Sequence, residues 1–136
     1  MPRAVFLIFL ALLIAPFARA DNLVGDRVVL RALDKVTATT EDFTVKVGED
    51  LHYGSLDIKV KHCEKKPPEE PPEVYAFLQI FDARTDGKGE NTEPKKLFSG
   101  WMFASSPALS ALEHPVYDVW VLDCLTPAAK SKSQKP

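Results

Sequence analysis

The sequence predicts a mainly β, single-domain fold: an antiparallel sandwich or a small barrel with one short helical turn and one disulfide. Six short runs rich in β-branched and aromatic residues, several of them alternating between apolar and polar, are separated by turn residues. No stretch has the period of a long amphipathic helix. Two cysteines, Cys63 and Cys124, are available to form one disulfide.

The first 20 residues are typical of a cleavable secretory signal. Arg3 supplies a positive charge before the almost continuously apolar residues 4–17. Small residues at Ala18 and Ala20 then form the pattern of a cleavage site. The apolar run of about 14 residues is shorter than the roughly 20 that a membrane-spanning helix needs. We therefore expect a periplasmic protein that has no transmembrane segment after signal removal.

Removing the predicted signal leaves 116 of the 136 residues, which is enough for one domain. We expect a β-rich domain over residues 21–125 and a disordered basic tail over residues 126–136. Loss of Arg3 and Arg19 leaves 15 basic residues against 19 acidic ones, so the net charge becomes −4. This acidity argues against binding to nucleic acid. The protein is predicted to be a monomer.

The first predicted strands are residues 27–33 and 42–47, joined by turn residues at 34–41 into a hairpin. Residues 56–63 also predict a strand, because apolar and polar side chains alternate along them. Strict alternation would place Cys63 on their polar face, so burial of the disulfide requires a bulge near His62 or the end of the strand there.

Three later strands are apolar on both faces, at residues 74–81, 97–103 and 116–124. Such strands are typical of the middle of a sheet with both faces covered, unless one face waits for a partner. Residues 105–113 have a capping serine and an early proline, which predict one or two helical turns. Residues 64–73 contain four prolines, four glutamates and two lysines, which predict an exposed, stiff polyproline II connector or a docking surface.

Cys63 and Cys124 are separated by 60 residues and have no C-x-x-C motif, so we predict a structural bridge. A loop of that length would destabilise the unfolded state by about 4 kcal/mol. We assign no catalytic residue, metal ligand or cofactor. Residues 82–93 imitate a calcium loop, but Arg84 occupies a position that should supply an oxygen. The three histidines are too scattered for a metal-binding spacing: His52, His62 and His114.

The richest group of aromatic and thioether side chains lies late in the chain. Core packing is the default interpretation, but a domain of about 116 residues has little interior in which to hide three strands that are apolar on both faces. We therefore name a candidate binding surface that consists of Trp101, Met102, Phe103, Glu113, His114 and Tyr117.

Four segments carry a resemblance to a known family: residues 33–37, 47–49 and 63–73, and above all the long motif at residues 98–124, which begins Phe98-Ser99-Gly100-Trp101 and ends at Cys124. They resemble the alphaproteobacterial domain of unknown function 2155 family. It covers nearly the whole predicted domain. It implies an exported envelope protein of a Gram-negative cell and supplies no activity or catalytic residue.

We therefore predict an exported cell-envelope protein with a non-catalytic binding or structural role, whose partner is another envelope protein, a peptide or a glycan. One alternative is an envelope-acting enzyme in which His114 is the base, with Asp118 and one of four serines, Ser99, Ser105, Ser106 or Ser110. No G-x-S-x-G motif supports it. The other alternative is a small-ligand carrier, in which Tyr75, Phe77 and Trp120 would line an open interior.

Overall fold

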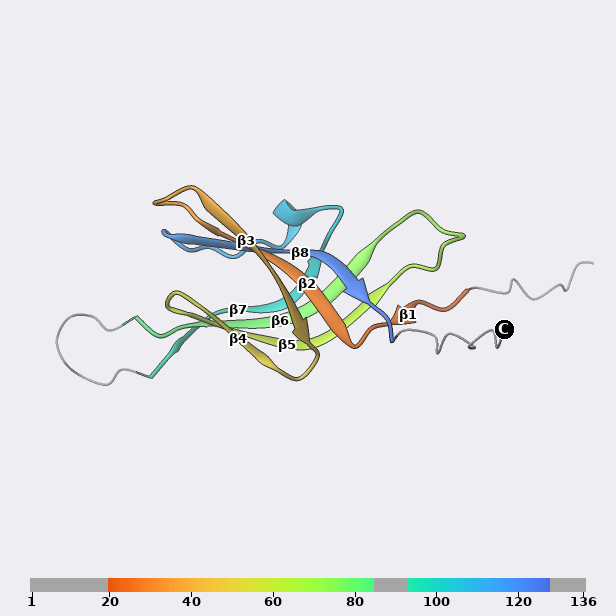
Figure 1. Cartoon of the computed structure of the whole chain (residues 1–136), viewed down its shortest axis with the longest axis horizontal. Coiled ribbons are helices and arrows are strands. Elements are labelled where there is room, and N and C mark those ends of the chain that lie inside the picture. Colours follow the sequence, from red (N-terminus) through yellow and green to blue (C-terminus); the bar gives the residue numbers. More distant parts are fainter. Residues whose placement is uncertain (1–19, 85–92, 128–136) are drawn as a thin grey trace, which may run out of the picture.

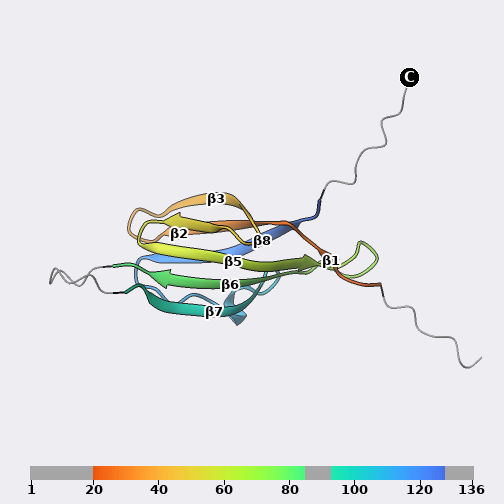
Figure 2. The same ribbon diagram turned by 90° about the horizontal axis from the view of Figure 1, so that it is seen from below.

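The computed structural model describes residues 20–84 and 93–127, which form two antiparallel sheets packed face to face (Figures 1 and 2). The larger sheet has the order β1-β5-β6-β7, with β4 also paired to β5. It contains β1 (Leu23–Val24), β4 (Asp50–Tyr53), β5 (Leu56–Lys65), β6 (Val74–Asp82) and β7 (Lys95–Phe103). The smaller sheet has the order β3-β2-β8 and contains β2 (Arg27–Asp34), β3 (Thr39–Lys46) and β8 (Tyr117–Leu125). Of the two predicted architectures, the protein is a sandwich.

All six predicted strands are present, together with the two short strands β1 and β4. The predicted hairpin is β2–β3, but its turn is tighter than expected because β3 already begins at Thr39. The predicted helical segment is reduced to a single 3-10 turn, η1 (Pro107–Leu109). No helix of the described part of the chain is long and apolar enough to cross a membrane. The predicted signal, except its last residue, and most of the predicted tail lie outside the described residues.

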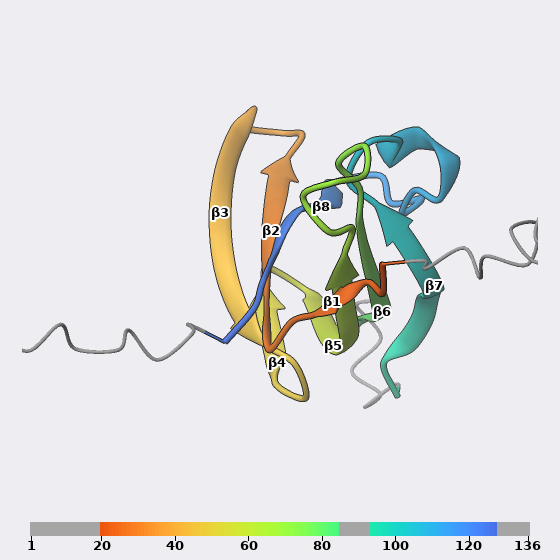
Figure 3. The same ribbon diagram turned by 90° about the vertical axis from the view of Figure 1, so that its right-hand side faces the viewer.

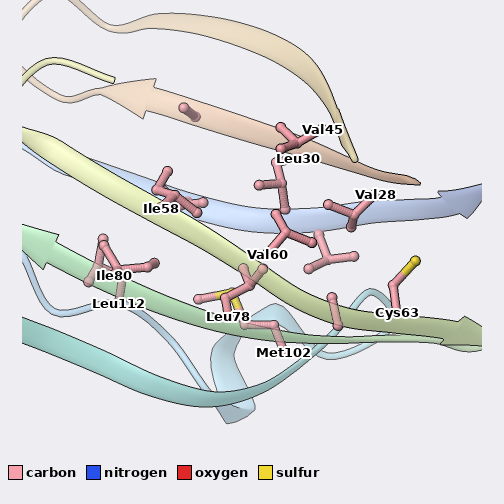
Figure 4. Packing of buried hydrophobic residues seen from close by; sticks show 14 of the residues in the cluster. Val28, Leu30, Val45, Ile58, Val60, Cys63, Leu78, Ile80, Met102 and Leu112 are labelled. Carbon is pink, nitrogen blue, oxygen red and sulfur yellow. The ribbon is translucent and has the colours of Figure 1, made fainter. Parts of the chain in front are cut away.

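Alternation of side chains along four strands builds the core between the sheets (Figure 4). Every second residue of these strands is buried: Val28, Leu30 and Ala32 on β2, Leu56, Ile58 and Val60 on β5, Ala76, Leu78 and Ile80 on β6, and Val119 and Val121 on β8. Only one face of each sheet therefore belongs to this core. The prediction that residues 97–103 and 116–124 lie in the middle of a sheet is wrong, because β7 and β8 are both edge strands. The inner face of β8 packs across the sandwich.

The bulge required by the cysteine pattern is present in β5. Val60 pairs with Leu78 and His62 pairs with Phe77, which leaves Lys61 without a partner on β6. The extra residue reverses the alternation beyond it, so Cys63 points into the core and is fully buried.

A disulfide between Cys63 on β5 and Cys124 on β8 joins the two sheets, with the Cα atoms 5.9 Å apart. The chain crosses from the larger to the smaller sheet beside this bridge, between β1 and β2 (Figure 3). There the Gly25 N–H donates to the Cys63 carbonyl at 3.0 Å, and a Cβ on Gly25 would overlap the Cys124 sulfur. The close packing of backbone against the disulfide therefore requires glycine at this position.

The proline-rich segment is not the extended connector that its composition predicts. The Glu70 N–H donates to the Pro67 carbonyl at 3.1 Å, which makes a tight turn, and Pro67 is buried. The Lys66 N–H donates to the Glu73 carbonyl at 2.9 Å. This segment closes the β5–β6 hairpin, because pairing of the two strands on either side brings its ends together.

Candidate binding surface

Five rings lie together on the outer face of the larger sheet. Since Ala76 and Leu78 of β6 point into the core, Tyr75 and Phe77 point outward. Pairing with β7 places Phe103 opposite Tyr75 and Trp101 opposite Phe77. On the other side of β6, the bulge places His62 opposite Phe77. We call these five residues the aromatic face: His62, Tyr75, Phe77, Trp101 and Phe103.

The rings of the aromatic face meet edge to face. Trp101 contacts Phe77 and His62 with centroid separations of 5.4 and 5.8 Å, and Tyr75 contacts Phe103 at 5.6 Å. Each such pair contributes about 0.5–1.5 kcal/mol beyond the area that it buries. Trp101 is nevertheless 41% exposed, and the other four residues are only half-buried. The face is therefore an ordered apolar surface in contact with solvent.

Charged groups lie at both ends of this surface. At one end, the ammonium groups of Lys59 and Lys96 lie 5.8 and 6.0 Å from the centroid of the Phe81 ring, within range of cation–π attraction. At the other end, Glu64 accepts a hydrogen bond from Asn22 at 2.9 Å and contacts His62 at 3.2 Å. The hydrogen bonds from Asn22 and His62 lower the pKa of Glu64, so its carboxylate stays charged near neutrality.

The structure divides the six residues of the predicted surface. Trp101 and Phe103 belong to the aromatic face, whereas Met102 between them points inward and is 2% exposed. Tyr117 packs against the core and stacks on His114, with centroids 5.2 Å apart. Glu113 is exposed on the segment between η1 and β8. Alternation and burial turn Met102, His114 and Tyr117 inward, so these three do not lie on the aromatic face with Trp101 and Phe103.

Sequence reasoning did not include His62, Tyr75 and Phe77 in the surface. The alternation of residues 74–81 already separated Tyr75 and Phe77 from Ala76 and Leu78, but both sets are apolar, so the pattern did not say which set faces the core. His62 joins the face only because of the bulge at Lys61.

His114 is buried, with a side chain 1% exposed, and both ring nitrogens are engaged. Nδ1 accepts hydrogen bonds from the backbone N–H groups of Val116 and Tyr117, each at 3.0 Å. Nδ1 therefore carries no proton, and the proton on Nε2 is donated to Asp82 at 3.1 Å. A ring held in this way has no free nitrogen with which to accept a proton from a substrate.

The catalytic arrangement considered from the sequence is absent among the described residues. Asp118, the expected orienting group, lies 3.8 Å from Lys35 and does not contact His114. The Ser105 hydroxyl donates a hydrogen bond to the Glu73 carboxylate, and the Ser99 hydroxyl accepts a hydrogen bond from Gln79 at 3.3 Å. The hydrogen bonds of the His114 ring go to Asp82, Val116 and Tyr117 and to none of the four serines, so these residues do not form a nucleophile with its base, and His114 is part of the scaffold.

Asp82 is the acidic partner of His114, and its side chain is also nearly buried. Burial alone would raise the pKa of Asp82, but interactions with Ser55, Arg84 and His114 outweigh it and lower the pKa to about 2. The Ser55 hydroxyl is buried beside the carboxylate without ordinary hydrogen-bond geometry, whereas Arg84 donates at 2.8 Å. Asp82 therefore remains an anion inside a set of local donors.

The same contacts bear on the calcium-like loop. Its first position is Asp82, whose carboxylate is already engaged by Arg84 and His114. Residues 85–92 of that loop lie outside the described part. Within residues 20–84 and 93–127, no group of three or more His, Cys, Asp or Glu side chains is arranged to hold a metal ion.

The residues named for a ligand-carrying interior do not line one. Tyr75 and Phe77 lie on the outer face of the larger sheet. Trp120 pairs with Arg31, between positions whose side chains point into the core, so it lies on the outer face of the smaller sheet. The space between the sheets is occupied by the aliphatic core.

A family model described as an uncharacterized protein conserved in bacteria (DUF2155) matches residues 28–124. The uncharacterized protein RP359 of Rickettsia prowazekii (strain Madrid E) is 37% identical over 93 residues, which is 68% of this chain and 57% of that protein. The match thus spans little more than half the length of the Rickettsia relative. No solved structure matches the chain. The matched region includes the strands that carry the core, the disulfide and the aromatic face, and the chain belongs to the DUF2155 family of bacterial proteins.

Proposed function

We propose that the protein is exported to the bacterial cell envelope and acts there as a non-catalytic module that binds another envelope protein through the aromatic face. The observation that carries this proposal is the cluster of five rings on an outer sheet face, with Trp101 41% exposed. The outer face of an antiparallel sheet is ordinarily polar when it meets water. Protein interfaces are enriched in tryptophan, tyrosine and phenylalanine.

The smaller sheet of the same protein has a mixed outer face. There Arg31 of β2 forms an ion pair with Asp42 of β3 and lies beside Trp120 of β8, which has no ring partner on that face among the described residues. The core lies between the sheets and does not use the rings of the aromatic face. The aromatic character of the larger sheet's outer face is therefore better explained by binding than by packing within the domain.

The arrangement of the rings favours a protein as the partner. Adjacent planes on the face make angles of 78°, 83° and 87°. Such rings present their edges as well as their faces, which the side chains of another protein can contact. Both ring nitrogens of His114 are engaged in hydrogen bonds, which supports a role without catalysis.

Export is supported by two features of the chain. Residues 1–20 have the pattern of a cleavable signal. The bridge between Cys63 and Cys124 is of a kind that persists in oxidising compartments. Cell fractionation tests this part directly: we expect a shortened, disulfide-bonded form in the periplasmic fraction, and an unprocessed, reduced cytoplasmic form would contradict it.

Site-specific photo-cross-linking in living cells tests the binding role. A photoreactive residue replaces Trp101, and the matched control replaces Thr44, which is exposed on β3 of the smaller sheet. We expect one defined envelope protein to be captured from position 101 and not from position 44. With that partner purified, Trp101→Ala is expected to weaken association by more than it lowers the free energy of unfolding, which falls because two ring contacts within the face are lost. If Trp101→Ala lowers stability and leaves association unchanged, the aromatic face is not the binding surface.

A further inference from the structure

The strand β7 lies at an edge of the larger sheet, and no strand within residues 20–84 and 93–127 pairs with the backbone of its free edge. The Ala104 N–H donates to the Val74 carbonyl at 3.0 Å and so extends the β6–β7 ladder. In an antiparallel ladder, alternate residues bond to the same neighbour. The backbone groups of Gly100 and Met102 therefore point toward β6, and those of Ser99 and Trp101 point toward the free edge.

The same alternation turns the Phe103 backbone away from β6. Its carbonyl accepts a hydrogen bond from the Ser106 N–H at 3.3 Å, which ends the edge at this point. Between these limits, Ser99 and Trp101 each offer one donor and one acceptor to a further strand.

The protection of this edge is limited: Lys95, Lys96 and a register shift against β6 lie near its start, and η1 contacts β7. For comparison, β3 is a long edge strand of the smaller sheet and carries three charged residues, Glu41, Asp42 and Lys46. On β7, Lys95 and Lys96 lie at the start, and residues 97–103 carry no charge. Exposed edges in natural proteins are normally blocked by charges, proline or a covering segment, because an open edge pairs with other strands.

We propose that the free edge of β7 pairs antiparallel with β7 of a second copy of this chain, which gives a two-fold symmetric dimer with one continuous sheet. This replaces the monomer expected from the sequence. An antiparallel pair of identical strands is self-complementary, as a two-fold interface requires. The two free-edge residues then bond reciprocally, with Ser99 of each copy opposite Trp101 of the other when Gly100 lies on the axis.

The charges at the two ends of β7 favour this direction. Lys95 and Lys96 are exposed at its start, whereas Ser105, just after its end, is held to the Glu73 carboxylate through its N–H at 3.1 Å and its hydroxyl. Antiparallel pairing brings the lysines of one copy to the Ser105–Glu73 end of the other. Parallel pairing would place lysines beside lysines, which is unfavourable.

Dimerisation would also extend the proposed binding surface. Trp101 and Phe103 of each copy lie next to the shared edge and on the same outer face, so the two aromatic faces become continuous. The dimer nevertheless rests on the backbone of β7 and on its charges, and it stands whether or not another protein binds.

Analytical ultracentrifugation of the purified protein over the micromolar range tests the dimer. We expect a reversible monomer–dimer equilibrium. Ser99→Pro removes a donor that points to the free edge and leaves the β6–β7 ladder intact, so dimerisation should weaken at least about tenfold, since two hydrogen bonds are lost per dimer. Ser99→Lys is a second variant that keeps the donor and introduces two like charges close to the axis.

The matched control is Thr44→Pro on β3. The Val47 N–H donates to the Asp26 carbonyl at 2.8 Å, so alternation also turns the Thr44 N–H away from β2, toward a free edge. We expect Thr44→Pro to leave the dimer unchanged. A protein that is monomeric throughout the range, or equal weakening by Ser99→Pro and Thr44→Pro, would overturn the proposal. The protein could also be monomeric in solution and still capture a different envelope protein from position 101. That outcome would preserve the proposed function and remove only the dimer.

Discussion

Substitution of His114 separates a structural histidine from a catalytic one. The ring links two parts of the fold: Nε2–H donates to Asp82 at the end of β6, and Nδ1 accepts from the backbone of Val116 and Tyr117 at the start of β8. The His114 carbonyl also accepts from Lys35, just after β2, at 2.8 Å. His114→Ala therefore removes side-chain contacts between both sheets while leaving the backbone contact to Lys35 in place.

The magnitude follows from the contacts. Each backbone N–H left buried without an acceptor costs about 1–3 kcal/mol, and the bond to the Asp82 carboxylate contributes about 1.5–3 kcal/mol. The ring stacked on Tyr117 contributes about 0.5–1.5 kcal/mol. Because neighbouring contacts are not additive, we expect a loss of about 4 kcal/mol in the free energy of unfolding. For a domain of this size, that corresponds to a fall of roughly 20 °C in Tm.

Urea unfolding of wild-type protein and three variants checks this expectation. His114→Asn places an oxygen near the position of Nδ1, so it keeps the backbone acceptor and loses the Asp82 contact. His114→Gln places its amide nitrogen near Nε2 and has the reverse effect. Both should lie between the wild-type protein and His114→Ala. An unfolding free energy for His114→Ala within about 0.5 kcal/mol of wild type, as for an ordinary surface substitution, would refute a structural role.

Three further predictions concern the disulfide, the glycine beside it and the buried acid. Reduction of the bridge, or replacement of both Cys63 and Cys124 by serine, should lower stability by about 4 kcal/mol, measured by chemical unfolding with and without a reductant. Gly25→Ala should cost about 2 kcal/mol or more, because its Cβ would overlap the Cys124 sulfur, and equal unfolding midpoints for variant and wild type would contradict this. The pKa of Asp82 is about 2 against an ordinary 3.8, so its ionisation stabilises the fold above pH 3.8 by about 2 kcal/mol, and this contribution is lost as the pH falls toward 2. Asp82→Asn should therefore lose less stability than wild type between pH 5 and pH 2, and parallel pH profiles would refute that assignment.

The strands could be predicted from the sequence because alternation is a local property. Residues 56–60 alternate strictly, and β5 occupies them with Leu56, Ile58 and Val60 in the core. The mismatch at Cys63 indicated either a bulge near His62 or the end of the strand there, and the structure has the bulge. The cysteine pair followed from its number: two cysteines allow one bridge.

Only the tertiary structure decided which apolar face of a strand is covered. Residues 74–81 are apolar on both sides, and Tyr75 and Phe77 face outward because the opposite side, with Ala76 and Leu78, meets β8 across the sandwich. It likewise paired His114 with Asp82, which lies 32 residues away, instead of Asp118. The fold class could thus be derived from neighbouring residues and the bridge from the number of cysteines. The aromatic face, the fully hydrogen-bonded histidine and the open edge of β7 arise from packing between distant segments, which no local pattern records.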